Sequence, residues 1–170
     1  MIDKAATILR DNRLMSLATT RADGWPHCSM VGFAEDGLDL YFVVSRHSQK
    51  LANIERDNRV AIVIGRDVID PRSIRGLSIA ARAQEVDDPV ERQRAVERLL
   101  DRRPALRQLE PPAPEHSAVM VARPHVVTIL DYSVSFGHTE TWTIDEDGKA
   151  KPAEGTPNDW GYGGELKPLH

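Results

Sequence analysis

Residues Trp25 to Gly65 read WPHCSMVGFAEDGLDLYFVVSRHSQKLANIERDNRVAIVIG, and this stretch decides the fold. Its pattern predicts a strand, a tight turn, a second strand, a polar loop, a short helix and a third strand. The first strand, His27 to Ala34, ends at Glu35-Asp36-Gly37, where the Asp-Gly pair supplies the positive φ angles of a hairpin turn. Leu38 to Val44 is therefore expected to run back antiparallel to it.

The loop after the second strand, Ser45 to Lys50, gathers hydroxyl and basic side chains at the entrance to the helix. Ser48 can cap the start of that helix. A phosphate group requires free backbone N–H groups, the positive end of a helix dipole and fixed cations, and this loop offers all three. The same composition also suits an ordinary solvated loop with a serine cap, so these residues alone leave both interpretations open.

Five segments, in order, carry a resemblance to a known family: LMSLATT, PHCSMVGF, DGLDLYFVVS, SQKLANIERDNRVAIVIG and GLSIAARAQEVDDP. Over Ile2 to Asp131 the chain resembles the FMN-binding split-barrel family related to pyridoxamine 5'-phosphate oxidase. The resemblance implies a mainly β fold, a six-stranded antiparallel split β-barrel with Greek-key topology and flanking helices. It also implies a homodimer with an FMN cofactor in each of two clefts at the subunit interface.

The resemblance further implies which residues bind the cofactor. Backbone groups of the first strand would contact the flavin ring and its ribityl chain, the second strand would line the cleft, and the loop would meet the phosphate. The residues implied in this way are Cys28, Ser29, Met30, Val31, Val43, Val44, Ser45, Arg46, Ser48, Gln49 and Lys50.

The chain departs from the oxidase pattern at three positions of the expected cofactor site, and more mildly at Asn58, which lacks the proline that follows it in the family. Cys28 and Phe33 stand where the oxidases have a basic residue at each end of the first strand, and Gln49 stands in place of an arginine. Phosphate binding is therefore expected to depend on Lys50, together with Ser48 and Arg46.

The substrate is expected to differ from that of the oxidases. Their chains end with arginine-rich segments that bind the phosphate of the vitamin, whereas no arginine follows Asp131 here. Synthesis of pyridoxal phosphate is thus disfavoured. An FMN-dependent oxidoreductase acting on another small molecule is the first hypothesis. The alternatives are a split barrel that binds the deazaflavin F420 or haem, and an FMN-binding stress-related protein with little turnover.

The composition sets the remaining limits. The 170 residues suit a single domain, residues 1–170. A net charge of −4 does not indicate a basic surface that would bind nucleic acid. No apolar run is long enough to span a membrane, and the N-terminus has no secretory signal, so a cytoplasmic location is expected. The six histidines show no paired metal-ligand spacing. Cys28, the single cysteine, lies in an apolar strand and is expected to be a buried, inert thiol.

Helices are expected at Ile2–Asn12, Gln49–Asp57 and Pro89–Arg103. Further strands are expected at Leu14–Thr20, Val60–Gly65, Gly76–Val86, Ala118–Val121 and Val126–Leu130, the last two separated at Arg123-Pro124. The unbroken apolar run of Val60–Gly65 suggests burial on both faces, and the small residues of Gly76–Val86 suit close approach of another chain or tight packing within the barrel. Residues 132–170 should add a small hairpin around Thr141–Ile144 and a glycine-aromatic tail, Asn158–Gly164.

Overall fold

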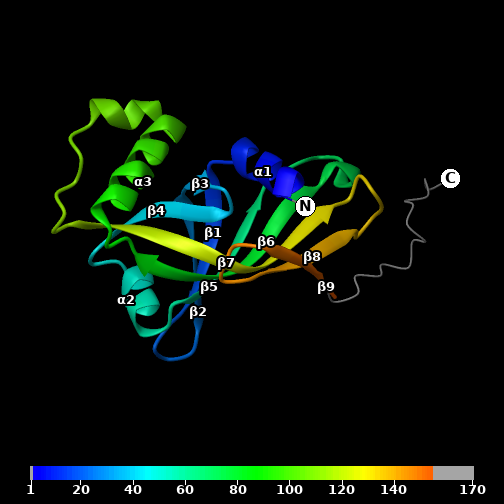
Figure 1. Ribbon diagram of the computed structural model, residues 1–170, viewed down its shortest axis with the longest axis horizontal. Helices are drawn as coiled ribbons and strands as arrows, with labels where there is room; N and C mark the ends of the chain where they lie inside the picture. The colour runs from blue at the N-terminus through cyan, green and yellow to red at the C-terminus, as the bar shows by residue number, and fades with distance from the viewer. Residues whose placement is uncertain (1, 155–170) are drawn as a thin grey trace.

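The computed structural model describes residues 2–154, which form one curled antiparallel sheet with three α-helices around it (Figure 1). The helices are α1 (Ile2–Asp11), α2 (Gln49–Arg56) and α3 (Pro89–Arg102), with short 3-10 turns η1 (Pro71–Ser73) and η2 (Pro104–Gln108). The strands are β1 (Leu14–Thr20), β2 (Pro26–Gly32), β3 (Ala34–Asp36), β4 (Asp39–Ser45), β5 (Arg59–Gly65), β6 (Arg75–Glu85), β7 (Ser117–Asp131), β8 (Thr139–Ile144) and β9 (Ala150–Ala153).

The predicted antiparallel split barrel is confirmed. The strand order is β2-β1-β5-β6-β7-β4-β3, and β8 and β9 extend the sheet from β7. The sheet of the described residues has nine strands where six were predicted, because β3 is a short separate segment and the β8–β9 hairpin joins the same sheet. Non-consecutive neighbours, β1 beside β5 and β4 beside β7, give the crossovers that a Greek-key arrangement requires.

The predicted hairpin within 27–44 is only partly correct. β2 pairs along its whole length with β1, from Leu14↔Gly32 to Thr20↔Pro26, and only the short β3 pairs with β4. The strand is interrupted at Phe33, whose side chain is buried and whose N–H donates to the carbonyl of Arg13. The turn is also shifted by one residue, since Asp36 pairs with Asp39 and Gly37 alone has a positive φ, of 64°.

One face of the sheet forms the core and the other stays open. Along β5, burial alternates strictly: Val60, Ile62 and Ile64 are buried, whereas Ala61 and Val63 are exposed. The prediction that this strand is buried on both faces was therefore wrong. Its apolar run reflects one face in the core of this subunit and a second apolar face that no described part of the chain covers.

The predicted break at Arg123-Pro124 is instead a bulge within one long strand. β7 runs continuously past both residues, and the register against β6 shifts between Ala80 and Ala81. Proline has no N–H to donate to a ladder, so a bulge is the usual way in which a sheet accommodates it.

All three predicted helices are confirmed, each ending one residue earlier than expected. The Ser48 hydroxyl accepts the N–H of Leu51, and the Asp88 carboxylate accepts that of Glu91, as N-caps do. The predicted C-terminal hairpin is confirmed as β8 and β9. The tail Asn158–Gly164 lies outside the described residues.

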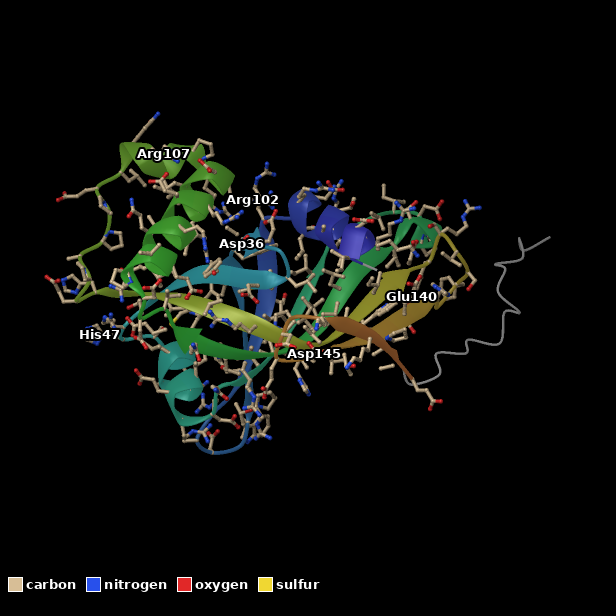
Figure 2. All side chains as sticks on the ribbon, viewed as in Figure 1. Asp36, His47, Arg102, Arg107, Glu140 and Asp145 are labelled. Atoms are coloured by element: carbon tan, nitrogen blue, oxygen red, sulfur yellow. The ribbon has the colours of Figure 1, made fainter. Side chains whose placement is uncertain are left out.

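Arg102, at the end of α3, holds α1 in place. Its guanidinium donates to the carbonyls of Leu9, Arg10 and Asn12 and lies 3.6 Å from the carboxylate of Glu35. The carbonyls at the end of a helix have no partners within the helix, so one cation satisfies several of them at once. Figure 2 shows Arg102 between α3 and α1.

We expect Arg102→Ala to lower the free energy of unfolding by at least about 2 kcal/mol, because charge-assisted hydrogen bonds at a largely buried site are lost. Arg107→Ala is the matched control, since the partners of Arg107 within residues 2–154 are the exposed Glu97 and Asp101. Arg107→Ala should lower the free energy of unfolding by less than about 1 kcal/mol. Urea unfolding followed by circular dichroism measures both, and equal losses would show that Arg102 is an ordinary surface residue.

Candidate functional site

The strands β2 and β4 leave open edges close to each other. β2 pairs with β1 on one side and with no second strand among the described residues. β3 covers β4 only from Asp39 to Tyr41, so the edge of residues 42–45 opposite β7 is also open. Residues of β2 and β4 nevertheless come near each other. Backbone N–H and C=O groups at such edges are available to hydrogen-bond a ligand.

The four cofactor-binding residues predicted on β2 divide between the two faces of the sheet. Val31 is buried in the core, and Ser29 is partly buried, with a hydroxyl that has no partner among the described residues. Cys28 and Met30 lie on the opposite face and are exposed. The expectation of a buried Cys28 thiol was wrong, because alternation along the strand turns its side chain away from the core.

On β4 and in the loop that follows, the predicted cofactor-binding residues again differ in their exposure and in their partners. Val44 belongs to the core, whereas Val43 and Ser45 are exposed. Arg46 pairs with Glu85 at 2.6 Å and donates to the Pro114 carbonyl at 2.7 Å. The hydrogen bond from Arg46 lowers the pKa of Glu85 below its usual value, so that carboxylate stays charged and neutralises the guanidinium. Arg46 is thus already paired.

The start of α2 contains a polar network that leaves one cation unpaired. Gln49 donates to Asn53, and the buried Asn53 donates to the hydroxyl of Thr19 on β1 at 2.9 Å. These bonds fix α2 against the barrel. Lys50 is partly buried and has no hydrogen-bond or ion-pair partner among the described residues. His47 is exposed at the outer side of the loop (Figure 2).

His27 is a residue that the sequence analysis did not assign to the site. It precedes Ser29 by two positions on β2, so both side chains lie on the same face of the strand. Its buried Nδ1 has no hydrogen-bond partner in the part of the chain that the structure describes, and neither does the Ser29 hydroxyl. The pairing of His27 with Thr19 brings it near the α2 network. Because residues two apart in a strand share a face, the position of His27 two residues before Ser29 is the sequence signal that could have identified it.

These groups fit a bound phosphate-containing or planar cofactor. Lys50 and the N-terminus of α2 provide the positive charge and the free N–H groups that a phosphate needs. Buried polar atoms without partners, such as His27 Nδ1 and Ser29 Oγ, are rare in folded proteins and suit a ligand that supplies the missing hydrogen bonds. For haem, His27 and His47 offer the imidazole that binds iron.

A separate cavity of about 730 Å³ lies at the other end of β2. Leu14, Met30 and Val63 contribute apolar surface to it, and Arg13, Arg66 and Arg103 contribute guanidinium groups. Met30 is the one predicted cofactor-binding residue among its lining residues. The sequence analysis did not find this cavity, since its walls come from four distant segments.

The described helices include none that is both long enough and apolar enough to cross a membrane.

Solved structures share this fold at low sequence identity. A haem-binding protein from Mycobacterium smegmatis superposes with a TM-score of 0.72 and 23% identity, over 84% of this chain and 57% of that protein. The chain therefore spans little more than half the length of that protein. A proposed pyridoxamine 5'-phosphate oxidase from Listeria innocua superposes with a TM-score of 0.64 and 23% identity, over 76% of this chain and 97% of that protein. The haem storage protein HutZ from Vibrio cholerae superposes with a TM-score of 0.57 and 19% identity, over 72% of this chain and 88% of that protein.

The family assignment rests on sequence. A comparison with curated proteins finds no match. The model of the pyridoxamine 5'-phosphate oxidase family, however, matches residues 1–131, which includes the whole of the Ile2 to Asp131 stretch that resembles this family. Because this match covers most of the chain, the protein belongs to the pyridoxamine 5'-phosphate oxidase family.

Proposed function

We propose that this protein is an FMN-dependent oxidoreductase that works as a homodimer on a small-molecule substrate and does not make pyridoxal phosphate. The flavin, when bound, supplies the hydride chemistry, and the protein supplies binding, orientation and access. Family membership supports a cofactor of this kind. The open edges of β2 and β4 offer backbone groups to a planar ring, and the start of α2 offers a phosphate site.

The observation that carries this proposal is the unpaired charge of Lys50. Arg46 is neutralised by Glu85, and Gln49 is neutral, so Lys50 is the cation of the 45–50 loop that remains for a phosphate. The Ser48 hydroxyl is occupied by the Leu51 N–H and can contribute only its remaining hydrogen-bonding capacity. A phosphate dianion would give this ammonium group a charged hydrogen-bond partner.

The open face of the sheet supports the homodimer. Two rows of small or apolar side chains cross β2, β1, β5 and β6 in register on this face. The rows consist of Cys28, Ala18, Ala61 and Ala80, and of Met30, Ser16, Val63 and Ser78. Met30 is 70% exposed and Val63 is 56% exposed. A second copy of the chain would cover this surface, because small side chains let two sheets approach closely.

We expect Lys50→Ala to weaken FMN binding by roughly 1.5 to 3 kcal/mol, or about ten- to a hundredfold, because a charged hydrogen bond to the phosphate is lost. Riboflavin lacks the phosphate and should lose much less. Titrating both flavins into apo protein by fluorescence measures this. Lys149→Ala is the control, since Lys149 is exposed and lies in the β8–β9 turn. Equal losses for both flavins, or none for FMN, would place the phosphate elsewhere.

We expect Val63→Glu to convert a dimer into monomers, because it buries a charge in the contact between the two sheets. Light scattering at micromolar concentration should give twice the chain mass of 19.0 kDa for the wild type and that mass itself for the variant. Val90→Glu is the control, since Val90 is also exposed but lies on α3. A monomeric wild type would contradict the proposed dimer.

Haem is the second candidate cofactor, favoured by a specific observation. Two of the similar structures are haem-binding or haem storage proteins, and here His27 has a buried ring nitrogen that no other group within residues 2–154 hydrogen-bonds. Histidine is a common axial ligand of haem iron. F420 remains a third candidate, and a cofactor-binding stress-related protein with little turnover remains the alternative to an enzyme.

The absorption spectrum of the freshly purified protein distinguishes these cofactors. We expect flavin bands and consumption of NAD(P)H. A strong Soret band that His27→Ala abolishes, without loss of fold by circular dichroism, would establish haem instead. Flavin bands without NAD(P)H consumption would favour the stress-related alternative.

A further inference from the structure

We propose that the C-terminal segment of this chain, residues 155–170, docks on an apolar patch formed by two loops at one end of the sheet. This end patch consists of Ile69, in the loop between β5 and β6, and of Tyr132, Val134 and Phe136, in the loop between β7 and β8. The inference is independent of the cofactor, because neither the end patch nor the segment contains a residue assigned to the cofactor site.

Hydrogen bonds hold the two loops of the end patch against each other. The N–H of Tyr132 donates to the carbonyl of Ile74 at 3.0 Å. Arg75 donates to the Asp131 carboxylate at 3.2 Å and to the Ser133 hydroxyl at 2.9 Å. Ile74 and Arg75 directly follow η1 in the β5–β6 loop, so this loop lies beside the β7–β8 loop. Figure 1 shows both loops at the end of the sheet away from α2 and α3.

The side chains of the end patch expose apolar surface. Ile69 is fully exposed, with a relative accessible area of 105%, and Val134 is 57% exposed. Tyr132 and Phe136 are partly buried, and their ring centroids lie 5.0 Å apart. One exposed apolar side chain is ordinary on a protein surface, whereas aliphatic and aromatic groups on adjacent loops are typical of a contact surface. Residues 2–154 leave this surface uncovered at Ile69.

The chain leaves β9 in the direction of the end patch. β9 runs antiparallel to β8, and its register passes from Ala150↔Ile144 to Ala153↔Thr141. A chain that continues beyond Ala153 in this direction passes the start of β8 and meets the loop that precedes it, the loop of Val134. The sheet register therefore directs residues 155–170 toward the end patch.

The length and composition of the segment suit this patch. Trp160 follows Glu154 by six residues, which reach up to roughly 20 Å when extended. The rings of Trp160 and Tyr162 can each bury about 150 to 250 Å² against an apolar surface. Glycines alternate with these aromatic residues, and their backbone freedom lets both rings turn toward the same surface.

The segment of the same chain is favoured over a second copy as the occupant. The dimer proposed above uses the outward face of β2, β1, β5 and β6, whereas the end patch lies in loops beyond the ends of β5 and β7. A segment tethered by a short linker has an effective concentration in the millimolar range. A separate molecule at micromolar concentration competes poorly with it.

The test is hydrogen exchange of the full-length protein followed by mass spectrometry, with a synthetic peptide of residues 155–170 as the unprotected reference. We expect amides of residues 159–166 to exchange at least about tenfold more slowly in the protein than in the peptide. Trp160→Ala should remove this protection and speed exchange in residues 132–138. Ile69→Ser combined with Val134→Ser should likewise speed exchange in residues 159–166. Unchanged exchange in β5 verifies that each variant folds.

Val90→Ser is the matched control, because Val90 is 73% exposed but lies on α3. It should leave exchange unchanged in residues 132–138 and 159–166. The proposal is wrong if residues 159–166 exchange as fast in the protein as in the peptide. It is equally wrong if Ile69→Ser with Val134→Ser leaves their exchange as it is in the wild type.

A disulfide experiment separates the segment of the same chain from that of a second copy. Val134→Cys is combined with Gly163→Cys in a Cys28→Ser background, which removes the single native thiol. After oxidation we expect an intrachain disulfide, in a protein that migrates as a monomer on a denaturing gel. A disulfide-linked dimer would assign the end patch to the segment of a second copy and overturn the proposal.

Discussion

One-sided burial of a curled sheet is the constraint on which the rest of this structure depends. Alternate residues of β1, β5, β6 and β7 turn inward and fill the core, so their neighbours in sequence must turn outward. The three helices lie around this sheet (Figure 1) and leave the outward face of β1, β2 and β5 bare. A second subunit and a ligand are the two kinds of partner that such a face can accept.

The distribution of charge then decides what each part of that surface can bind. Most arginines are already paired: Arg46 with Glu85, Arg94 and Arg98 with Asp36, and Arg123 with Glu91. These pairs fasten loops and α3 to the barrel. Among the cations without counter-ions in the described part of the chain are Lys50 at one end of β2 and Arg13 and Arg103 at the other. The bare strand β2 thus has a cation without a counter-ion near each end.

The two ends of β2 are held by different means. At the α2 end, a chain of side-chain hydrogen bonds from Gln49 through Asn53 to Thr19 fixes the helix to β1. At the Gly32 end, Arg102 links α3 to the carbonyls that end α1. Both connections join segments that are distant in the sequence, so the spacing between the two regions follows from the barrel as a whole. Rigid support of this kind favours precise placement of a ligand.

The sequence by itself determined the features that depend on neighbouring residues. Ser48, Asp88 and Pro89 mark helix starts because capping involves residues two or three positions apart, and the order of five segments identified the family. Only the tertiary structure decided which strand pairs with which and which face stays bare. β2 pairs with β1 rather than β4, Cys28 and Val63 are exposed, and Arg46 meets Glu85, because these outcomes depend on partners far along the chain. The arginine cavity could not be foreseen for the same reason, since Arg13, Arg66 and Arg103 meet only when α1, β5 and α3 pack around β2.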